Sequence, residues 1–249
     1  MSKFIKETII ALKSYFKVWS FIVEHKLWAL LWISVIANLG LFIGLIFALL
    51  FGFKGLTKLI DSLIGIVDFP SWLISSIGFV ISVITIFSIY RFLALIFLSP
   101  LFSYISERVQ KIIIGIDNPF SFRQLCFDII RGIRIAFRNL FLELGLTALF
   151  FFLGGITFGL LAPFIPFVLY FVSAYFFGFA MIDYRSEIRR LNTKDSIRLV
   201  KNHRGIATGI GIGFKVFILL PLFGILFAPL YAIIAGALAM EEVENTTFI

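Results

Sequence analysis

The sequence predicts an all-α integral membrane protein that forms a single membrane domain, 1–249. The chain is 61% hydrophobic and only 14% charged, whereas soluble domains carry about 25% charged residues. Its mean hydropathy is +1.07. The apolar residues gather in uncharged runs longer than the ~20 residues that cross a bilayer. The charged segments between these runs are mostly basic, which is typical of the cytoplasmic side of a membrane.

The N-terminal segment, 1–26, predicts an amphipathic helix. At helical spacing Lys6, Lys13 and Lys17 share one face, and large apolar side chains share the opposite face. These apolar residues are Ile5, Ile9, Leu12, Phe16, Trp19 and Val23. Such a helix either lies in the membrane interface with its lysines toward lipid headgroups or packs on the rest of the protein. The pattern leaves both alternatives open.

Two long transmembrane helices are predicted at 28–53 and 69–105. The first is uncharged throughout. The loop 54–68 has two lysines and two aspartates, so its lack of net charge predicts the outer side of the membrane. The second helix is longer than one crossing requires. We expect it to bend near Ser99-Pro100, because proline removes a backbone donor and disfavours helix at the preceding residue.

Two basic segments, 106–139 and 183–204, are predicted to be cytoplasmic together with both termini. The first has six basic and three acidic residues, and the second has seven basic and three acidic residues. Because such an excess sets the orientation of a membrane protein, we expect a multi-pass protein of the inner cell membrane with a cytoplasmic N-terminus.

Two proline-broken helical hairpins are predicted at 140–182 and 205–240. Basic segments flank the first on both sides, so the chain is expected to enter and leave on one face. The turns are predicted at Pro163 and Pro166 in the first hairpin and at Pro221 and Gly224 in the second. The arms of the second hairpin are short for a full crossing, which favours hairpins that penetrate the membrane halfway.

A stripe of glycines, Gly205, Gly209 and Gly213, opens the second hairpin at a spacing of four residues. On a helix this spacing forms a small-residue face that allows close packing of another helix. The alternative is an anion held by exposed glycine amides at the start of the helix.

The sequence shows no arrangement that indicates catalysis. Its two histidines, His25 and His203, and its single cysteine, Cys126, give no zinc-ligand spacing. No nucleophile elbow, carboxylate pair or phosphate-binding loop is visible. We therefore expect neither an enzyme nor a metal, cofactor or nucleic-acid partner.

Basic side chains near the apolar runs are the candidates for binding an anion. These candidates are Lys26, Arg108, Arg131, Arg134 and Lys215. Arginine suits a tetrahedral oxyanion because its planar fork donates two parallel hydrogen bonds and stays charged. Arg131 and Arg134 are three residues apart and face the same way on a helix.

Structural roles for the same charges stay open. Glu107 could hold Arg108 in place, or pair with Arg131 or Arg134 in a structural network. Arg91 follows a complete span, so it is predicted to snorkel to the interface or to pair structurally. Lys215 lies deep in an apolar run, where an unpaired charge is costly, and this favours a functional or a pairing role.

Three segments resemble a known family. The stretch Ser99-Pro-Leu-Phe-Ser-Tyr-Ile-Ser-Glu-Arg-Val109 is similar to a Pro-Phe segment followed by Glu-Arg-Val in CysZ sulfate permeases and the related etoposide-induced 2.4 family. Arg131-Gly-Ile-Arg134 resembles that family's Arg-Gly helix. The run from Phe179 through Asp183-Tyr184 to Arg204-Gly205 resembles its Asp-Tyr and Asn-Arg segments. The order of the segments is also the same.

The resemblance implies a fold with two long transmembrane helices and half-penetrating hairpins, assembled as a homo-oligomer among membrane lipids. It implies sulfate uptake for sulfur assimilation. The family's Gly-Leu-Arg sulfate motif before the first span corresponds to Glu24-His-Lys-Leu-Trp28 here, in which Lys26 supplies a charge. The alternative function is a non-transport membrane protein that organises lipid or partner proteins.

Overall fold

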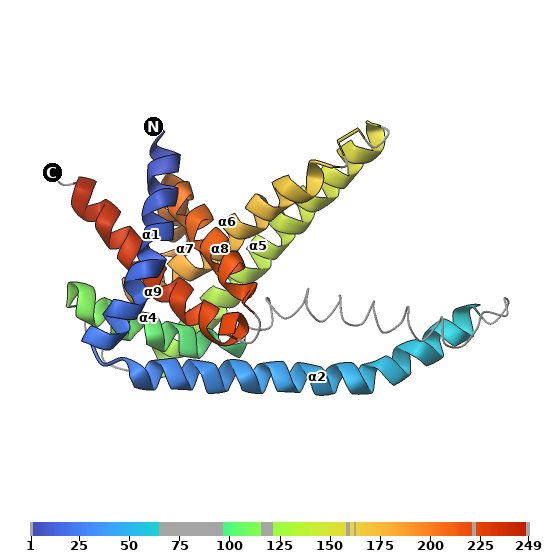
Figure 1. The fold of residues 1–249 in the computed structure, drawn as a ribbon, viewed down its shortest axis with the longest axis horizontal. Helices are drawn as coiled ribbons and strands as arrows, with labels where there is room; N and C mark the ends of the chain where they lie inside the picture. Colours follow the sequence, from blue (N-terminus) through green and yellow to red (C-terminus); the bar gives the residue numbers. More distant parts are fainter. Residues whose placement is uncertain are drawn as a thin grey trace. The chain divides into compact units, whose positions relative to one another are not determined.

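The computed structural model describes residues 2–64, 97–115, 122–157, 160–161, 163–220 and 223–247. Over these residues every regular element is a helix, which confirms the all-α class (Figure 1). The helices are α1 (Lys3–Glu24), α2 (Trp28–Ile64), α4 (Ser99–Ile114), α5 (Phe122–Ile156), α6 (Ile165–Ile188), α7 (Thr193–Asn202), α8 (Arg204–Ile218) and α9 (Phe223–Thr247).

Four helical stretches are long and apolar enough to cross a membrane, which supports the membrane assignment. They are Trp28–Ala48, Ile130–Ile156, Ile165–Ile188 and Leu226–Asn245. Only 11% of the most apolar part of the second stretch is buried within the protein. Lipid or another protein must cover such a surface.

The chain forms two compact units. One comprises Met1–Val35 and Ser99–Ile249, and the other comprises Ile36–Leu98. In the second unit α2 continues past the predicted end at residue 53 and through Lys54 to Ile64, so the loop predicted at 54–68 is helical over most of its length. The physical reason is that the chain has no proline before Pro70, and an isolated lysine does not end a helix. Most of the second predicted long helix, including Arg91, lies outside the described residues.

In the first unit, α8 packs closely against α1 through the glycine stripe. A Cβ atom at Gly209 would lie 2.6 Å from the Cβ of Ala11, and one at Gly213 would lie 2.3 Å from the ring of Tyr15. A Cβ at Gly205 would lie 2.3 Å from the carbonyl oxygen of Phe4. The three glycines therefore face α1, where only a hydrogen atom fits.

The opposite side of α8 contacts α6 in the same way, through glycines that the sequence analysis did not single out. A Cβ at Gly211 would lie 1.8 Å from the carbonyl oxygen of Ala174, and one at Gly178 would lie 1.8 Å from that of Ala207. Beside them the rings of Phe177 and Phe214 stack with centroids 3.7 Å apart. Hence α8 lies between two helices, each at backbone contact distance.

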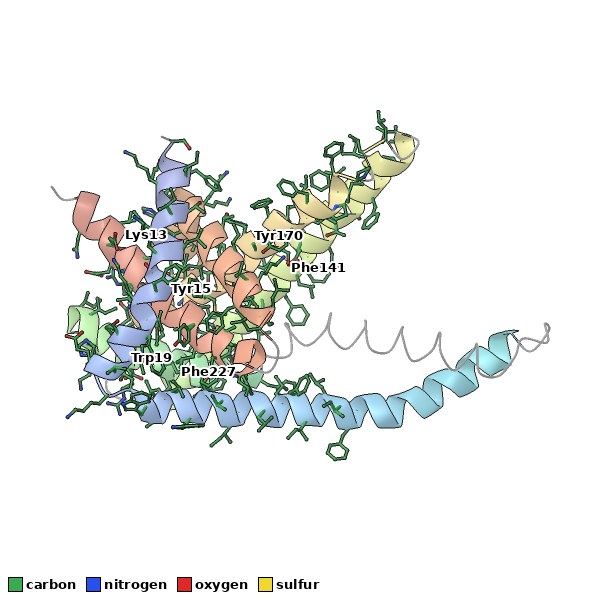
Figure 2. The ribbon with its side chains drawn as sticks, in the orientation of Figure 1. Lys13, Tyr15, Trp19, Phe141, Tyr170 and Phe227 are labelled. Carbon is green, nitrogen blue, oxygen red and sulfur yellow. The ribbon has the colours of Figure 1, made fainter. Side chains whose placement is uncertain are left out.

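Helix α1 packs on the rest of the protein, which is one of the two alternatives left open for the N-terminal segment. A narrow stripe of it is buried, and α1 packs against α8 and α9. The stripe consists of Glu7, Ala11, Ser14, Val18 and Ile22. The predicted apolar face stays exposed, and Phe16 reaches 85% exposure. Figure 2 shows Lys13, Tyr15 and Trp19 along this helix.

Helices α5 and α6 contact each other and lie side by side (Figure 1). Helix α5 ends at Ile156 and α6 begins at Ile165. Pro163 lies in this connection, and Pro166 lies in the first turn of α6, where its missing N–H has no partner to lose. The borders predicted between the basic segments and the first hairpin, at 139/140 and 182/183, lie inside α5 and α6, which run through them without interruption. The apolar arms and the basic segments therefore share the same helices.

Helices α8 and α9 also contact each other, and the connection between them lies at 219–222. A Cβ at Gly224 would lie 2.4 Å from the carbonyl oxygen of Phe217, so a glycine allows the start of α9 to meet the end of α8. Pro221 lies outside the described residues. Pro229 lies inside α9, which continues past residue 240 to Thr247.

The contact between α6 and α8 predicts that Gly211→Ala destabilises the protein by about 1–3 kcal/mol, because a methyl group there overlaps a backbone oxygen that cannot rotate away. Thermal unfolding of the purified protein in detergent measures this change. The matched control is Gly145→Ala on α5, where a Cβ meets nothing within 4 Å. Equal melting temperatures for the two variants would contradict the close contact.

Candidate functional site

The carboxyl-terminal end of α6 is the most highly charged part of the buried core. Every residue from Asp183 to Ile188 is buried, although this stretch belongs to a segment predicted from its charge to be cytoplasmic. The side chain of Arg185 is only 1% exposed. Since buried charges are costly unless they are paired, the partners of these residues determine how the surrounding helices are placed.

Asp183 joins three helices. Arg131 of α5 places Nη2 2.7 Å from Oδ1 of Asp183, and the hydroxyl of Ser196 in α7 donates to the same oxygen. Both side chains of the ion pair are largely buried. Arg131 was a candidate for binding an anion or for pairing with Glu107, and the structure instead gives it Asp183 as a partner. This contact favours a structural role for Arg131.

Arg185 and Arg189 join α6 to α9. Arg185 Nη2 lies 2.8 Å from Glu244 and 3.1 Å from Glu241. Arg189 lies 2.9 Å from Glu244 and 3.3 Å from Glu241. Two guanidinium groups thus share two carboxylates, an arrangement in which each charge meets more than one opposite charge. The acidic residues near the end of α9 thus complete this cluster.

Helix α4 reaches the same end of α6 through two contacts. The hydroxyl of Ser103 donates to Oε1 of Glu187. The ring of Phe102, which precedes Ser103 on α4, meets the ring of Tyr184 on α6 edge to face, with centroids 5.6 Å apart. The end of α6 therefore contacts α4, α5, α7 and α9 through polar or aromatic pairs.

The start of α8 already holds an anionic group, which belongs to the chain itself. Oε2 of Glu7 accepts a hydrogen bond of 3.2 Å from the backbone N–H of Gly205. Its Oε1 lies 2.9 Å from Nδ1 of His203 and 3.6 Å from Nζ of Lys3. A carboxylate at a helix N-terminus is stabilised by the unpaired amides and the helix dipole. Of the glycine amides proposed as an anion site, that of Gly205 thus binds Glu7.

A second polar contact fixes α1 on α8. The hydroxyl of Tyr15 donates to the carbonyl oxygen of Ile210 at 2.7 Å, and burial raises the pKa of Tyr15 well above its ordinary value. The phenol therefore stays protonated and acts as a donor.

The remaining anion candidates lie on separate elements. Arg108 on α4 is exposed and donates to the hydroxyl of Tyr104 at 3.1 Å. Arg134 on α5 is exposed, and no side chain pairs with it among the residues that the structure describes. Lys26 is exposed in the turn between α1 and α2, with a positive φ of 53°. The structure thus separates Arg131 from Arg134, since only Arg131 is drawn into the ion-paired core.

Lys215 lies half-buried on α8, where it contacts α6. Its Nζ donates to the carbonyl oxygen of Tyr170 at 3.0 Å and lies 4.3 Å from the centre of that ring. Figure 2 labels Tyr170 on α6. These contacts stabilise an ammonium group among apolar helices and favour the pairing role for Lys215. Over the described residues no group of three metal-ligating side chains is present.

The Arg131–Asp183 pair predicts a large loss of stability for Arg131→Ala. Removing the guanidinium leaves Asp183 buried without its counter-charge, which costs about 3–5 kcal/mol. The melting temperature of the detergent-solubilised protein should fall accordingly. The matched control, Arg134→Ala, removes an exposed arginine one turn away and should leave the melting temperature within error. If both variants melt like the parent protein, the pair does not stabilise the fold.

The Glu7 contact predicts that Glu7→Gln weakens the attachment of α1 to α8. Loss of the charge at the start of α8 should cost about 1–2 kcal/mol, and limited proteolysis should then cleave α1 faster. Glu24→Gln, at the exposed end of α1, is the control. Unchanged proteolysis in Glu7→Gln would show that the carboxylate does not hold α1.

Comparison with known proteins gives one family. Residues 14–229 match the family described as Sulfate transporter CysZ/Etoposide-induced protein 2.4. No curated protein matches the chain. The matched range includes α4 to α8 and the ion-paired end of α6, in agreement with the resemblance found in the sequence. Because the match spans most of the chain, this protein belongs to the Sulfate transporter CysZ/Etoposide-induced protein 2.4 family.

Proposed function

We propose that this protein is a membrane permease for an inorganic oxyanion, with sulfate for sulfur assimilation as the leading substrate. The observation that carries the proposal is family membership over 14–229. The proposal includes no catalytic step, cofactor or nucleic-acid partner.

The distribution of positive charge supports this function. Arg131, Arg185 and Arg189 are occupied by carboxylates, so they do not offer a complete guanidinium to a substrate. Other basic side chains stay exposed on α4, α5, α7, α8 and the turn that follows α6. They are Arg108, Arg134, Arg190, Lys194, Arg198, Lys201 and Arg204. Exposed positive charges concentrate anions near the protein surface. A single exposed arginine binds an anion weakly enough to release it again.

We place the protein in the inner cell membrane with its N-terminus and basic segments in the cytoplasm. The basic excess supports this orientation. The α5–α6 and α8–α9 pairs are proposed to penetrate the membrane halfway. The exposed apolar residues of α5 and α6, among them Phe151 and Phe167, then face lipid or further copies of the chain, so we propose a homo-oligomer.

Radiolabelled sulfate flux into proteoliposomes of the purified protein tests the function. We expect flux above that of protein-free liposomes, and we expect other tetrahedral oxyanions to compete. Arg134→Ala should reduce the flux several-fold at low sulfate concentration, because it removes an exposed anion-attracting charge without affecting the fold. Lys13→Ala, which removes an exposed lysine of α1, is the charge-matched control. Absence of flux for every oxyanion tested would refute the permease.

The second candidate is a non-transport membrane protein that organises lipid or partner proteins. The exposed apolar face of α1 favours it, since Phe16 is 85% and Trp19 52% exposed. A helix with this face and several lysines suits the membrane interface. Binding of anionic liposomes by the protein without any anion flux would support this candidate over the permease.

A further inference from the structure

A polar stripe runs along the buried face of α4. Ser99, Ser103, Ser106 and Gln110 follow one another at intervals of four, three and four residues, so they share one face of the helix. This face is turned into the bundle, because α4 packs against α5, α6 and α9. The opposite face carries exposed Arg108. A buried helix face would ordinarily be apolar.

Two members of this stripe have unused hydrogen-bonding atoms. Ser106 is 1% exposed and Gln110 is 0% exposed. Within the part of the chain that the structure describes, the hydroxyl of Ser106 and both amide atoms of Gln110 have no hydrogen-bond partner. Burial of such atoms costs their full desolvation penalty, so an apolar side chain of the same size would stabilise the fold better. Stability of the fold therefore does not explain why polar side chains occupy positions 106 and 110.

The chemistry of the two side chains suits an oxyanion. The hydroxyl and the amide NH₂ supply donors, and neither side chain carries a charge. The buried carboxylate that contacts this stripe, Glu187, accepts a hydrogen bond from the hydroxyl of Ser103, and buried Asp183 is paired with Arg131. Neutral donors bind an anion without the strong hold of a salt bridge, which conduction requires. Polar residues inside membrane bundles commonly mark substrate paths.

We infer that Ser106 and Gln110 form a neutral hydrogen-bonding station for the transported oxyanion inside the helix bundle. The inference rests on the proposed permease function and assigns part of its path to the buried face of α4. Sulfate or a related oxyanion accepts hydrogen bonds there from the Ser106 hydroxyl and the Gln110 amide. The exposed arginines attract the anion, and the Ser106 and Gln110 side chains bind it on its way between the helices.

Sulfate flux and melting temperature, measured together in proteoliposomes and detergent, test the station. Gln110→Met keeps the size of the side chain and removes its donors. We expect about a tenfold loss of flux, since a hydrogen bond to a charged group contributes that much to binding, with an unchanged or higher melting temperature. Ser106→Ala should act in the same direction. Unchanged flux in both variants overturns the inference.

The control for Ser106→Ala is Ser14→Ala. Ser14 is also fully buried, but its hydroxyl donates to the carbonyl oxygen of Ile10 in its own helix at 2.9 Å. This variant should retain the flux. If Ser14→Ala loses as much flux as Ser106→Ala, the effect belongs to buried serines in general and the station is rejected.

A second measurement decides the matter if Gln110→Met does not fold. The chain has one cysteine, so Gln110→Cys in a Cys126→Ser background places a single thiol at the station. A small anionic thiosulfonate reagent should label this thiol, and sulfate should slow the labelling several-fold. A thiol that stays unlabelled, or whose labelling ignores sulfate, overturns the station. Absence of flux in the parent protein refutes the permease instead, and the labelling result then judges the site separately.

Discussion

Burial of charge at the end of α6 is the constraint on which the surrounding structure depends. Asp183, Arg185 and Glu187 lie inside the protein, and each would destabilise it if left unpaired. Their partners come from four other helices, namely Ser103 of α4, Arg131 of α5, Ser196 of α7 and the two glutamates of α9. Because these contacts require defined distances, the charges determine which helix ends meet, whereas apolar packing alone tolerates sliding.

Close backbone contact is the second constraint, and it acts on α8. Glycines on two faces let α1 and α6 approach that helix from different sides. Between apolar helices in lipid there is little hydrophobic drive for association, so close packing and hydrogen bonds must hold them. The Glu7 carboxylate at the start of α8 and the Tyr15 hydroxyl farther along supply such bonds. The polar contacts fix the register that the glycines make possible.

The sequence predicted features that depend on local pattern. The all-helical class, the apolar run after Trp28 and the face formed by Gly205 and its two repeats follow from composition and periodicity, and the structure contains them. It did not predict that Asp183 meets Arg131 or that Arg185 meets Glu244. These residues are more than 50 positions apart, and charge patterning along a chain identifies orientation, not partners.

The same limit explains the error at the end of α2. Lys54 after an apolar run was taken as the start of a loop, yet α2 continues through it to Ile64. A helix ends where its backbone can no longer continue, and an isolated lysine does not prevent continuation. Ser106 lies in a segment that carries the family resemblance and Gln110 directly follows it, but the significance of this polar stripe depends on burial, which the sequence does not show.

The positive charge of this protein therefore divides into two populations with different physical roles. Arginines in the core are neutralised by carboxylates and hold helices together, so their removal acts on stability. Surface arginines and lysines retain their charge toward solvent, so their removal acts on the local anion concentration, which depends on ionic strength. The formal net charge of the protein adds core and surface basic residues together, so it does not indicate the role of either group. Arg131, Arg185 and Arg189 already face carboxylates, so on the proposed path an anion meets the neutral donors of α4 and no arginine that lacks a counter-charge.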